Sequence, residues 1–234
     1  MKTDVDAAPV QPIVPLPLPF KPYYHANGIT IYNADCRKVL PWLEPFDLLL
    51  TDPPYGIDAD NRKKILSRGK LAPPTDYGDT SWDKAPPPKW FIEASRSVAD
   101  VSILWGGNYY EGLPPSSCWL VWDKDNTGDF ADCELAWTNM PKAVRKFKWR
   151  WNGMLQENMG DKKETRVHPT QKPMALMRWC LSLVPEAQTV LDPFMGSGTT
   201  LVAAKLEGRK AVGIEINERY CEAAAKRLSQ GTLF

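Results

Sequence analysis

The chain has 234 residues, 43% of them hydrophobic, which is enough for one core of single-domain size. It carries 29 basic and 28 acidic residues, so its total charge indicates no particular class of partner. The N-terminal sequence does not resemble a signal peptide, and no apolar run approaches the ~18 residues of a membrane span. We therefore expect a cytoplasmic protein without membrane contacts.

The five cysteines are scattered, and none forms a Cys-x-x-Cys pair. With only two histidines in the chain, neither a zinc site nor a disulfide framework is expected from this pattern. We expect no metal.

Residues 1–27 form a proline-rich arm, with six prolines between positions 9 and 22. Proline fixes φ and removes a hydrogen-bond donor, so this segment is either a disordered tail or an extended arm that packs on the body or on a partner. Residues 28–234 are expected to form a single domain.

Apolar and β-branched runs alternate with amphipathic patterns along the rest of the chain. Strands are predicted at 29–34, 47–51, 101–105, 119–123, 134–138, 189–191 and 210–216, and helices at 89–99, 174–184, 199–207 and 217–228. This alternation predicts an α/β domain with a mostly parallel, seven-stranded sheet that has helices on both faces. Two long stretches lack a period: residues 56–88, a candidate lid, and residues 139–170.

Basic residues gather in two islands. Residues 61–70 contain five Lys or Arg and no acid, and residues 142–172 contain nine against three acids, while the remainder is acidic. This distribution is typical of a localised surface for a polyanion, and the alternative is that both islands are solvated loops.

The tetrapeptide Asp52-Pro53-Pro54-Tyr55 directly follows a predicted buried strand. Ligand sites of α/β proteins lie at such carboxyl ends, and two prolines there impose a rigid, extended backbone. The alternative is a stiffened strand exit without a chemical role.

Residues 189–200 predict a strand, a turn with Gly196 and Gly198, and the start of a helix. Glycines let a ligand approach the backbone, and the helix N-terminus offers free N–H groups. Leu201 stands where the dinucleotide fingerprint needs a third glycine, and there is no P-loop Gly-Lys-Ser/Thr. Glu215 ends the next strand, where an acid can accept both hydroxyls of a ribose. The unit predicts a cofactor site without a pyrophosphate, the alternative being a purely structural turn.

These motifs together resemble the amino-methyltransferases of DNA, whose hallmarks are D/N/S-P-P-Y/F/W and F-x-G-x-G. Residues 52–55 match the first motif, and residues 194–198, Phe-Met-Gly-Ser-Gly, match the second. The catalytic motif precedes the cofactor motif, which is similar to the β group of the family. Residues 168–173, His-Pro-Thr-Gln-Lys-Pro, resemble the segment that walls the methionine end of the pocket in that group, although they also suit a helix start with Pro173 at its first position. The segment Asn-Ala-Asp-Cys at 33–36 matches the contacts to the cofactor's adenine.

The resemblance covers roughly residues 28–229 and implies a Rossmann-like S-adenosyl-methionine-dependent methyltransferase fold with circularly permuted motif order. The implied substrate is an exocyclic amine in double-stranded DNA. The implied catalytic residues are Asp52, Pro53, Pro54 and Tyr55. The implied cofactor-binding residues are Asp35, Cys36, His168, Thr170, Asp192, Phe194, Gly196, Ser197, Gly198, Thr199, Glu215 and Ile216.

The chemistry of such an amine explains these residue types. An exocyclic amine is a poor nucleophile because its lone pair is delocalised into the ring. The Asp52 carboxylate and the Pro53 carbonyl would accept hydrogen bonds from its two N–H groups. These bonds would aim the nitrogen lone pair at the methyl group and stabilise the positive charge that develops on the nitrogen. Tyr55 is expected to stack on a base swung out of the duplex.

Adenine N6 is the expected target, because DPPY is commoner among adenine-N6 enzymes; the alternative is cytosine N4, whose enzymes more often begin the motif with serine. Cytosine C5 chemistry needs a thiolate, usually preceded by proline, and none of the five cysteines follows a proline. Methylation of RNA or protein by the same fold is disfavoured, because those relatives generally carry Asn in place of Asp52. A relative that only binds is disfavoured by the intact motifs.

Target recognition is expected in about residues 139–170, where basic residues interleave with Phe147, Trp149 and Trp151. The same alternation describes an amphipathic strand whose aromatic residues belong to the core. The region is short for the family, which indicates a short or relaxed target or a homodimer whose second subunit adds contacts. The expected DNA-binding residues are Arg62, Lys63, Lys64, Arg68, Arg145, Lys146, Lys148, Arg150, Lys162 and Lys163.

Overall fold

The protein is described by a computed structural model over residues 19–56, 87–95, 97–126, 131–152, 155–160, 163–168 and 170–230. Nearly all of the predicted lid at 56–88, with Arg62, Lys63, Lys64 and Arg68, lies outside these residues, as does Lys162. Within the described ranges, no helix is long and apolar enough to cross a membrane. The same ranges contain no group of three or more potential metal ligands.

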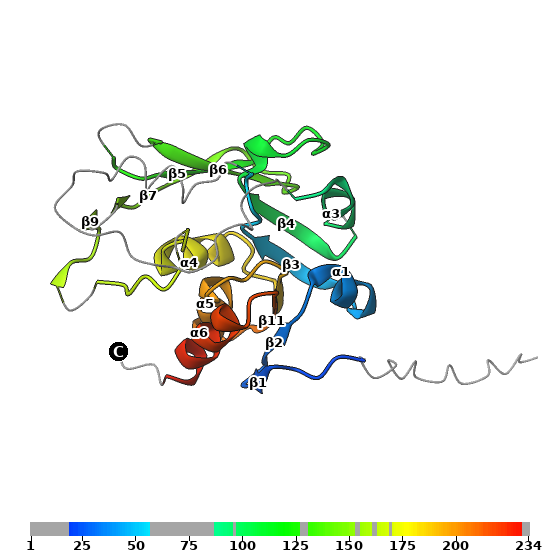
Figure 1. Cartoon of the computed structure of the whole chain (residues 1–234). Helices are drawn as coiled ribbons and strands as arrows, with labels where there is room; N and C mark the ends of the chain where they lie inside the picture. The colour runs from blue at the N-terminus through cyan, green and yellow to red at the C-terminus, as the bar shows by residue number, and fades with distance from the viewer. Residues whose placement is uncertain are drawn as a thin grey trace, which may run out of the picture.

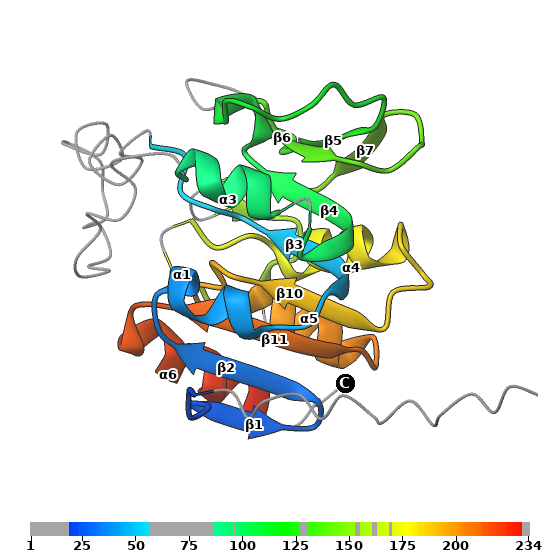
Figure 2. The same ribbon diagram turned by 90° about the vertical axis from the view of Figure 1, so that its right-hand side faces the viewer.

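A nine-stranded sheet in the order β1-β2-β11-β10-β3-β4-β6-β5-β7 forms the centre of the molecule (Figure 1). Strands β2, β11, β10, β3 and β4 are mutually parallel and lie side by side in Figure 2, whereas β6 runs antiparallel between β4 and β5. The strands are β1 Tyr24–Ala26, β2 Ile29–Asn33, β3 Phe46–Thr51, β4 Ala99–Trp105, β5 Trp119–Asp123, β6 Cys133–Thr138, β7 Arg145–Lys148, β10 Thr189–Asp192 and β11 Lys210–Glu215. A separate antiparallel pair consists of β8 Trp151–Asn152 and β9 Leu155–Gln156.

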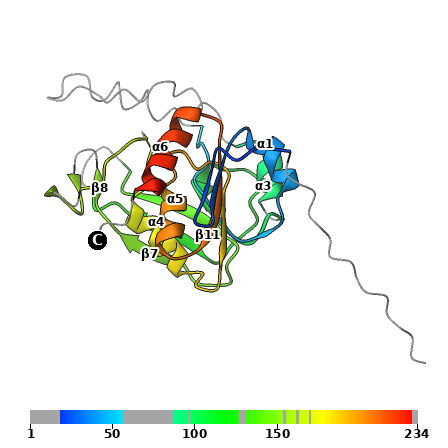
Figure 3. The same cartoon turned by 90° about the horizontal axis from the view of Figure 1, so that it is seen from below.

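Helices cover both faces of the sheet (Figure 3). One face carries α4 Met174–Ser182, α5 Thr199–Leu206 and α6 Glu218–Ser229, and the other carries α1 Cys36–Val39, the 3-10 turn η1 Leu40–Trp42 and α3 Lys89–Ala94. Strand β3 shows why both faces are apolar: Leu48 and Leu50 pack in the core under α4–α6, and Leu49 packs in the core under α1 and α3. Alternate residues of a strand point to opposite faces, so a sheet covered on both sides needs a continuous apolar run.

All seven predicted strands are present, but the prediction of seven strands in the sheet is wrong, because β1 and β7 extend it at its two edges. Strand β1 belongs to the segment that the sequence assigned to the arm. It pairs with β2 through a two-residue turn in which Asn27 has φ 51° and Gly28 has φ 76°, the left-handed conformations of a type I′ hairpin. The predicted helix at 89–99 ends at Ala94, since Ser95 Oγ bonds back to Ile92 O at 2.7 Å and β4 begins at Ala99.

The expected permutation is confirmed by the topology. The unit β10–α5–β11 comes last in the chain, yet β10 and β11 lie between β2 and β3. The strand order reverses where β10 meets β3, and open α/β sheets bind ligands at the carboxyl ends of strands beside such a point. Asp192 ends β10 and Asp52 follows β3, and Thr51 Oγ1 donates to Asp192 Oδ1 at 2.7 Å. The fold therefore brings the two motifs together.

Candidate active site

Asp52 lies at the carboxyl end of β3, with both carboxylate oxygens engaged. Tyr55 Oη donates to Oδ1 at 2.6 Å, and Lys172 Nζ donates to Oδ2 at 2.6 Å. Tyr55 returns to Asp52 because the two intervening prolines fix the backbone over this short span. Each carboxylate oxygen keeps a further lone pair for a ligand.

A buried network of charges surrounds this carboxylate. Lys172 Nζ also lies 3.0 Å from Glu134 Oε2, on β6, and the other oxygen of Glu134 forms an ion pair with Lys124. Lys172 belongs to the segment 168–173, but its contact with Asp52 was not predicted. Glu134 and Lys124 match no motif; the only sequence signal for Glu134 is an acid inside the otherwise apolar strand that became β6.

This network shifts the pKa values of Asp52 and Glu134 in opposite directions. Burial raises the pKa of Asp52, the Lys172 ammonium opposes that rise, and the Glu134 charge adds to it. Burial also acts to raise the pKa of Glu134, but Lys172 and Lys124 outweigh it and hold that pKa at about 2. The pKa of Lys172 is raised, because its two carboxylate partners overcome the effect of burial. Glu134 is thus an anion throughout the neutral range, and Asp52 is the more easily protonated acid.

The second predicted acceptor, the Pro53 carbonyl, receives the hydroxyl of Tyr110 at 3.0 Å. The same hydroxyl lies 2.8 Å from Trp105 O, so its single proton is shared between the two carbonyl oxygens and ties the motif to the end of β4. The ring of Tyr55 stacks on Tyr109, with centroids 5.1 Å apart and an interplanar angle of 19°. In this structure Tyr109 therefore occupies one face of the ring on which a flipped base was expected to stack.

The glycine turn between β10 and α5 approaches Glu215 closely. Gly196 N donates to one carboxylate oxygen of Glu215 at 3.0 Å, and Asn217 N donates to the other at 2.8 Å. These two bonds fix the carboxylate, and its remaining acceptor capacity suits the hydroxyls of a ribose. Ile216, next in the chain, is 68% exposed and offers an apolar surface beside that acid.

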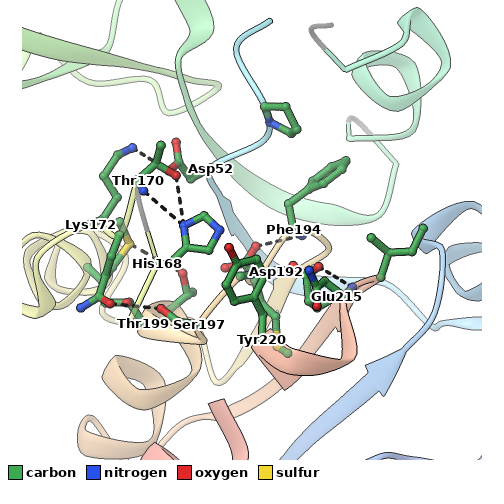
Figure 4. Close-up of a pocket in the computed structure, with 18 residues that line it drawn as sticks. Asp52, His168, Thr170, Lys172, Asp192, Phe194, Ser197, Thr199, Glu215 and Tyr220 are labelled. Atoms are coloured by element: carbon green, nitrogen blue, oxygen red, sulfur yellow. Dashed lines mark hydrogen bonds and ion pairs between the residues drawn. The ribbon is translucent and has the colours of Figure 1, made fainter. Parts of the chain in front are cut away.

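A cavity of about 410 Å³ connects the two motifs, within the range of ~300–1,000 Å³ typical of small-molecule sites. Asp52 lies at one side and Glu215 at the other, with His168 and Tyr220 between them (Figure 4). Asp192 lies 3% exposed in its wall, and burial raises its pKa to about 7. The predicted residues that line it are Asp52, Pro54, His168, Thr170, Asp192, Phe194, Gly196, Ser197, Thr199, Glu215 and Ile216.

The segment before α4 supplies one wall of this cavity. Thr170 N donates to His168 Nδ1 at 3.3 Å, which places the proton of a neutral imidazole on Nε2, and the ring packs edge-on against Tyr220. The sequence suggested Pro173 as the first residue of α4, but in the structure Pro173 is the N-cap of this helix. Glu164 instead satisfies the helix start by accepting from Met174 N at 3.1 Å.

Five predicted site residues lie outside the cavity lining. Gly198 is the N-cap of α5, and Pro53 and Tyr55 are the chain neighbours of Pro54, which does line the cavity. Asp35 caps α1 by accepting from Arg37 N at 2.9 Å, and Cys36, the first residue of that helix, is buried. Their loop does lie beside the cofactor motif, since Asn33 Nδ2 donates to Glu215 O and Ile216 O at 3.0 and 3.1 Å.

Most described basic residues of the predicted recognition region are exposed, whereas Arg166 is partly buried with its guanidinium over the ring of Trp151. Lys146 pairs with Asp123, and Lys148 and Arg150 pair with Asp125, along the outer edge of β7. Arg145, also on β7, and Lys163, in the segment before α4, are exposed. The aromatic residues take the alternative role: Phe147 stacks on Trp149 and Trp179, and Trp151 is 6% exposed, so they pack on the core.

Known proteins with similar sequences include Type II methyltransferases. The Type II methyltransferase M2.DpnII of Streptococcus pneumoniae is 28% identical over 89% of this chain and 92% of its own. The Type II methyltransferase M2.LlaDCHI of Lactococcus lactis subsp. cremoris is 28% identical over 92% of this chain and 94% of its own.

Solved structures agree in fold. The crystal structure of the M1.HpyAVI–SAM complex superimposes with a TM-score of 0.51 at 25% identity, covering 86% of this chain and all of that one. The cytosine-N4-specific PvuII DNA methyltransferase gives a TM-score of 0.56 at 17% identity, covering 93% and 92% of the two chains. The family model described as DNA methylase, for N6 and N4 enzymes, matches residues 107–226, from the end of β4 into α6. With the DPPY and glycine motifs on one cavity of this fold, the chain belongs to the N6/N4 DNA methylase family.

Proposed function

We propose that this protein is a Type II-like DNA methyltransferase that transfers a methyl group from S-adenosyl-methionine to the N6 amine of adenine in double-stranded DNA. The observation that carries the proposal is a single cavity that Asp52 of the DPPY motif shares with the glycine turn and Glu215. The Type II methyltransferase relatives and the family model support the reaction and the substrate class. Asp at the first position of DPPY supports adenine over cytosine.

The cavity fits the cofactor by the chemistry of its walls. The Glu215 carboxylate, fixed by two backbone N–H groups, suits a ribose diol, and the exposed side chain of Ile216 suits a base. His168 and Thr170 wall the opposite end, near Asp52. When bound there, the cofactor supplies an electrophilic methyl group on a cationic sulfur.

The protein's own groups prepare the amine. Asp52 accepts one N–H of the target amine and the Pro53 carbonyl accepts the other, which turns the nitrogen lone pair toward the cavity. The Asp52 charge then stabilises positive charge on the nitrogen as it is methylated, and the rigid Pro-Pro backbone holds both acceptors without reorganisation. The excess proton leaves to solvent after transfer, so no general base is needed.

DNA reaches this site from the side of the recognition region, where Arg145, Lys146, Lys148, Arg150 and Lys163 offer cations to the phosphates. Because this recognition region is small, a homodimer in which the second subunit adds contacts to DNA is part of the proposal.

Transfer of a labelled methyl group to unmethylated duplex DNA, followed by base analysis, tests the proposal. We expect the label in N6-methyladenine; label in N4-methylcytosine would move the assignment to the other base, and no label in DNA would refute it. Asp52→Ala should abolish transfer while S-adenosyl-methionine binding stays measurable by calorimetry, because Glu215 and the glycine turn remain. Normal turnover in that variant would refute the role of Asp52.

A further inference from the structure

The buried ammonium of Lys172 joins two carboxylates that would otherwise repel each other. Its side chain is 6% exposed, and Nζ lies 2.6 Å from Asp52 Oδ2 and 3.0 Å from Glu134 Oε2. The Tyr55 hydroxyl bridges the same two acids, at 2.6 Å from Asp52 Oδ1 and 3.2 Å from Glu134 Oε2. Lys124 pairs with Glu134, and its ammonium lies over the Trp122 ring, 5.0 Å from the ring centroid. The four charged groups sum to zero, and Lys172 is the cation in contact with Asp52.

Without this ammonium, Asp52 and Glu134 would be two acids joined through one hydroxyl. Neighbouring carboxylates that cannot both ionise share a proton. Lys124 would keep Glu134 ionised, so the proton would go to Asp52. A protonated Asp52 has lost the charge that favours a developing cation and offers a donor where the target amine needs an acceptor.

We propose that Lys172, anchored by Glu134, is a positioning residue that keeps Asp52 ionised and oriented toward the target amine. The inference rests on the proposed function, because it assigns Asp52 the role of acceptor. Lys172 acts through Asp52 and needs no contact with the reacting atoms.

The other groups around Asp52 do not replace Lys172. Asp192, at the end of β10, is acidic, and the charge of Asp52 helps to raise its pKa. The pKa of Tyr55 is raised well above its ordinary value by burial and by both acids, so this hydroxyl stays neutral and donates. Tyr110 donates to carbonyl groups, and His168 bonds to Thr170 on the cavity wall.

The pH dependence of methyl transfer tests the inference. In Lys172→Met, the acid limb of the single-turnover rate on unmethylated duplex DNA should move to higher pH by about 1–3 units. In Glu134→Gln it should move to lower pH, because a negative neighbour is lost and Lys172 remains. Lys172→Arg should keep the acid limb of the rate profile at the wild-type pH. The double variant Lys172→Met/Glu134→Gln should place that limb between the positions found in the two single variants. Lys89→Met is the control, since Lys89 is an exposed lysine that pairs with Glu111.

A second measurement needs no turnover. S-adenosyl-methionine and S-adenosyl-homocysteine differ by one methyl group and the sulfonium charge, so their affinity ratio reports the charge of the acids in the cavity, Asp52 and Asp192 among them. In Asp52→Asn the ratio should keep the titration of Asp192 and lose that of Asp52. The pH midpoint of the part lost in Asp52→Asn should rise in Lys172→Met and fall in Glu134→Gln.

The outcomes separate the inference from the proposed function. Wild-type protein that binds neither compound, or leaves DNA unmethylated, refutes the proposed function. A different result overturns the inference and leaves the proposed function intact. In that case the wild-type protein binds the cofactor and methylates DNA, while Lys172→Met and Glu134→Gln lose rate equally at every pH and keep the wild-type pH midpoint. If Lys172→Met does not fold, Glu134→Gln still tests the coupling of these charges, and an acid limb that stays at the wild-type pH overturns the inference.

Discussion

Glu215 shows how one side chain can serve both the fold and the ligand. Its two oxygens accept from Gly196 N and Asn217 N, which fixes the glycine turn against the end of β11. Burial raises the pKa of Glu215, and these two N–H bonds oppose the rise. The acid is thereby held as an acceptor beside the cavity.

Glu215→Ala should weaken S-adenosyl-methionine binding by about tenfold to a hundredfold, the loss of one or two charged hydrogen bonds. It should also lower the melting temperature, because two N–H groups lose their partner. Titration calorimetry and thermal unfolding measure the two effects. Glu218→Ala, which removes an exposed acid from the first turn of α6, is the control; it should leave the affinity unchanged and lower the melting temperature much less. Unchanged affinity in Glu215→Ala would contradict the ribose assignment.

At the scale of elements, the glycine turn depends on the packing of α6 against the start of α5. Gly198 has φ 76°, and a Cβ added there would lie 2.7 Å from Ala224 Cβ on α6. Gly208, after α5, has φ 70° but no atom within 4 Å of an added Cβ. Any other residue would be strained at both positions because φ is positive, but only at Gly198 would its side chain also collide with α6.

Gly208→Ala should therefore cost about 1 kcal/mol of unfolding free energy, the cost of a left-handed non-glycine residue. Gly198→Ala should cost about 1–3 kcal/mol more, because the helices must separate, and cofactor affinity should fall with it. Urea unfolding compares them directly. Equal losses in the two variants would show that α6 does not constrain the turn.

Alternate side chains of strand β7 have different roles: Phe147 packs on the core, and the exposed Lys146 and Lys148 are available to DNA. Phe147→Ala should lower the unfolding free energy by about 2 kcal/mol, because its ring is stacked between Trp149 and Trp179. Lys146→Ala and Lys148→Ala should barely change stability, since their ion pairs are exposed. Each lysine variant should instead reduce the salt dependence of DNA binding by about one counterion. Fluorescence anisotropy at several salt concentrations tests this, and an unchanged slope would exclude these lysines from the DNA interface.

At the scale of the whole molecule, the cavity makes stability depend on pH. Burial raises the pKa of Asp192 to about 7, from an ordinary value of 3.8, and Thr51 and Phe194 N only partly compensate. Between these two pH values the folded state holds a proton that the unfolded chain has released. Stability from this group is therefore present at low pH and is lost as pH rises toward 7.

Asp192→Asn should flatten the pH dependence of the unfolding free energy between pH 4 and 7, removing a slope of up to about 1.4 kcal/mol per pH unit. The amide oxygen can still accept from Thr51 without taking a charge. Denaturant unfolding at several pH values measures the slope. A variant that keeps the full wild-type slope would show that other acids control it.

Much of this protein follows from sequence because its signals are local. The runs at 47–51 and 210–216 predict β3 and β11 by composition and length, and the two motifs name Asp52, Gly196 and Glu215 without reference to the rest of the chain. The edge strands β1 and β7 are harder to predict, because they are short and polar. Strand β1 nonetheless has a local signal in the Asn27-Gly28 turn.

Only the tertiary structure brought Lys172, Glu134 and Asp52 into contact. They lie 38 or more positions apart, and no spacing rule connects residues from the segment before α4, from β6 and from the end of β3. The aromatic residues of 147–151 show the same limit, since alternation cannot say which face of a strand a neighbouring helix will cover. The sequence thus determined the motifs and the type of site, while burial and charge neighbours, which decide the ionisation of its acids, depended on how distant segments pack.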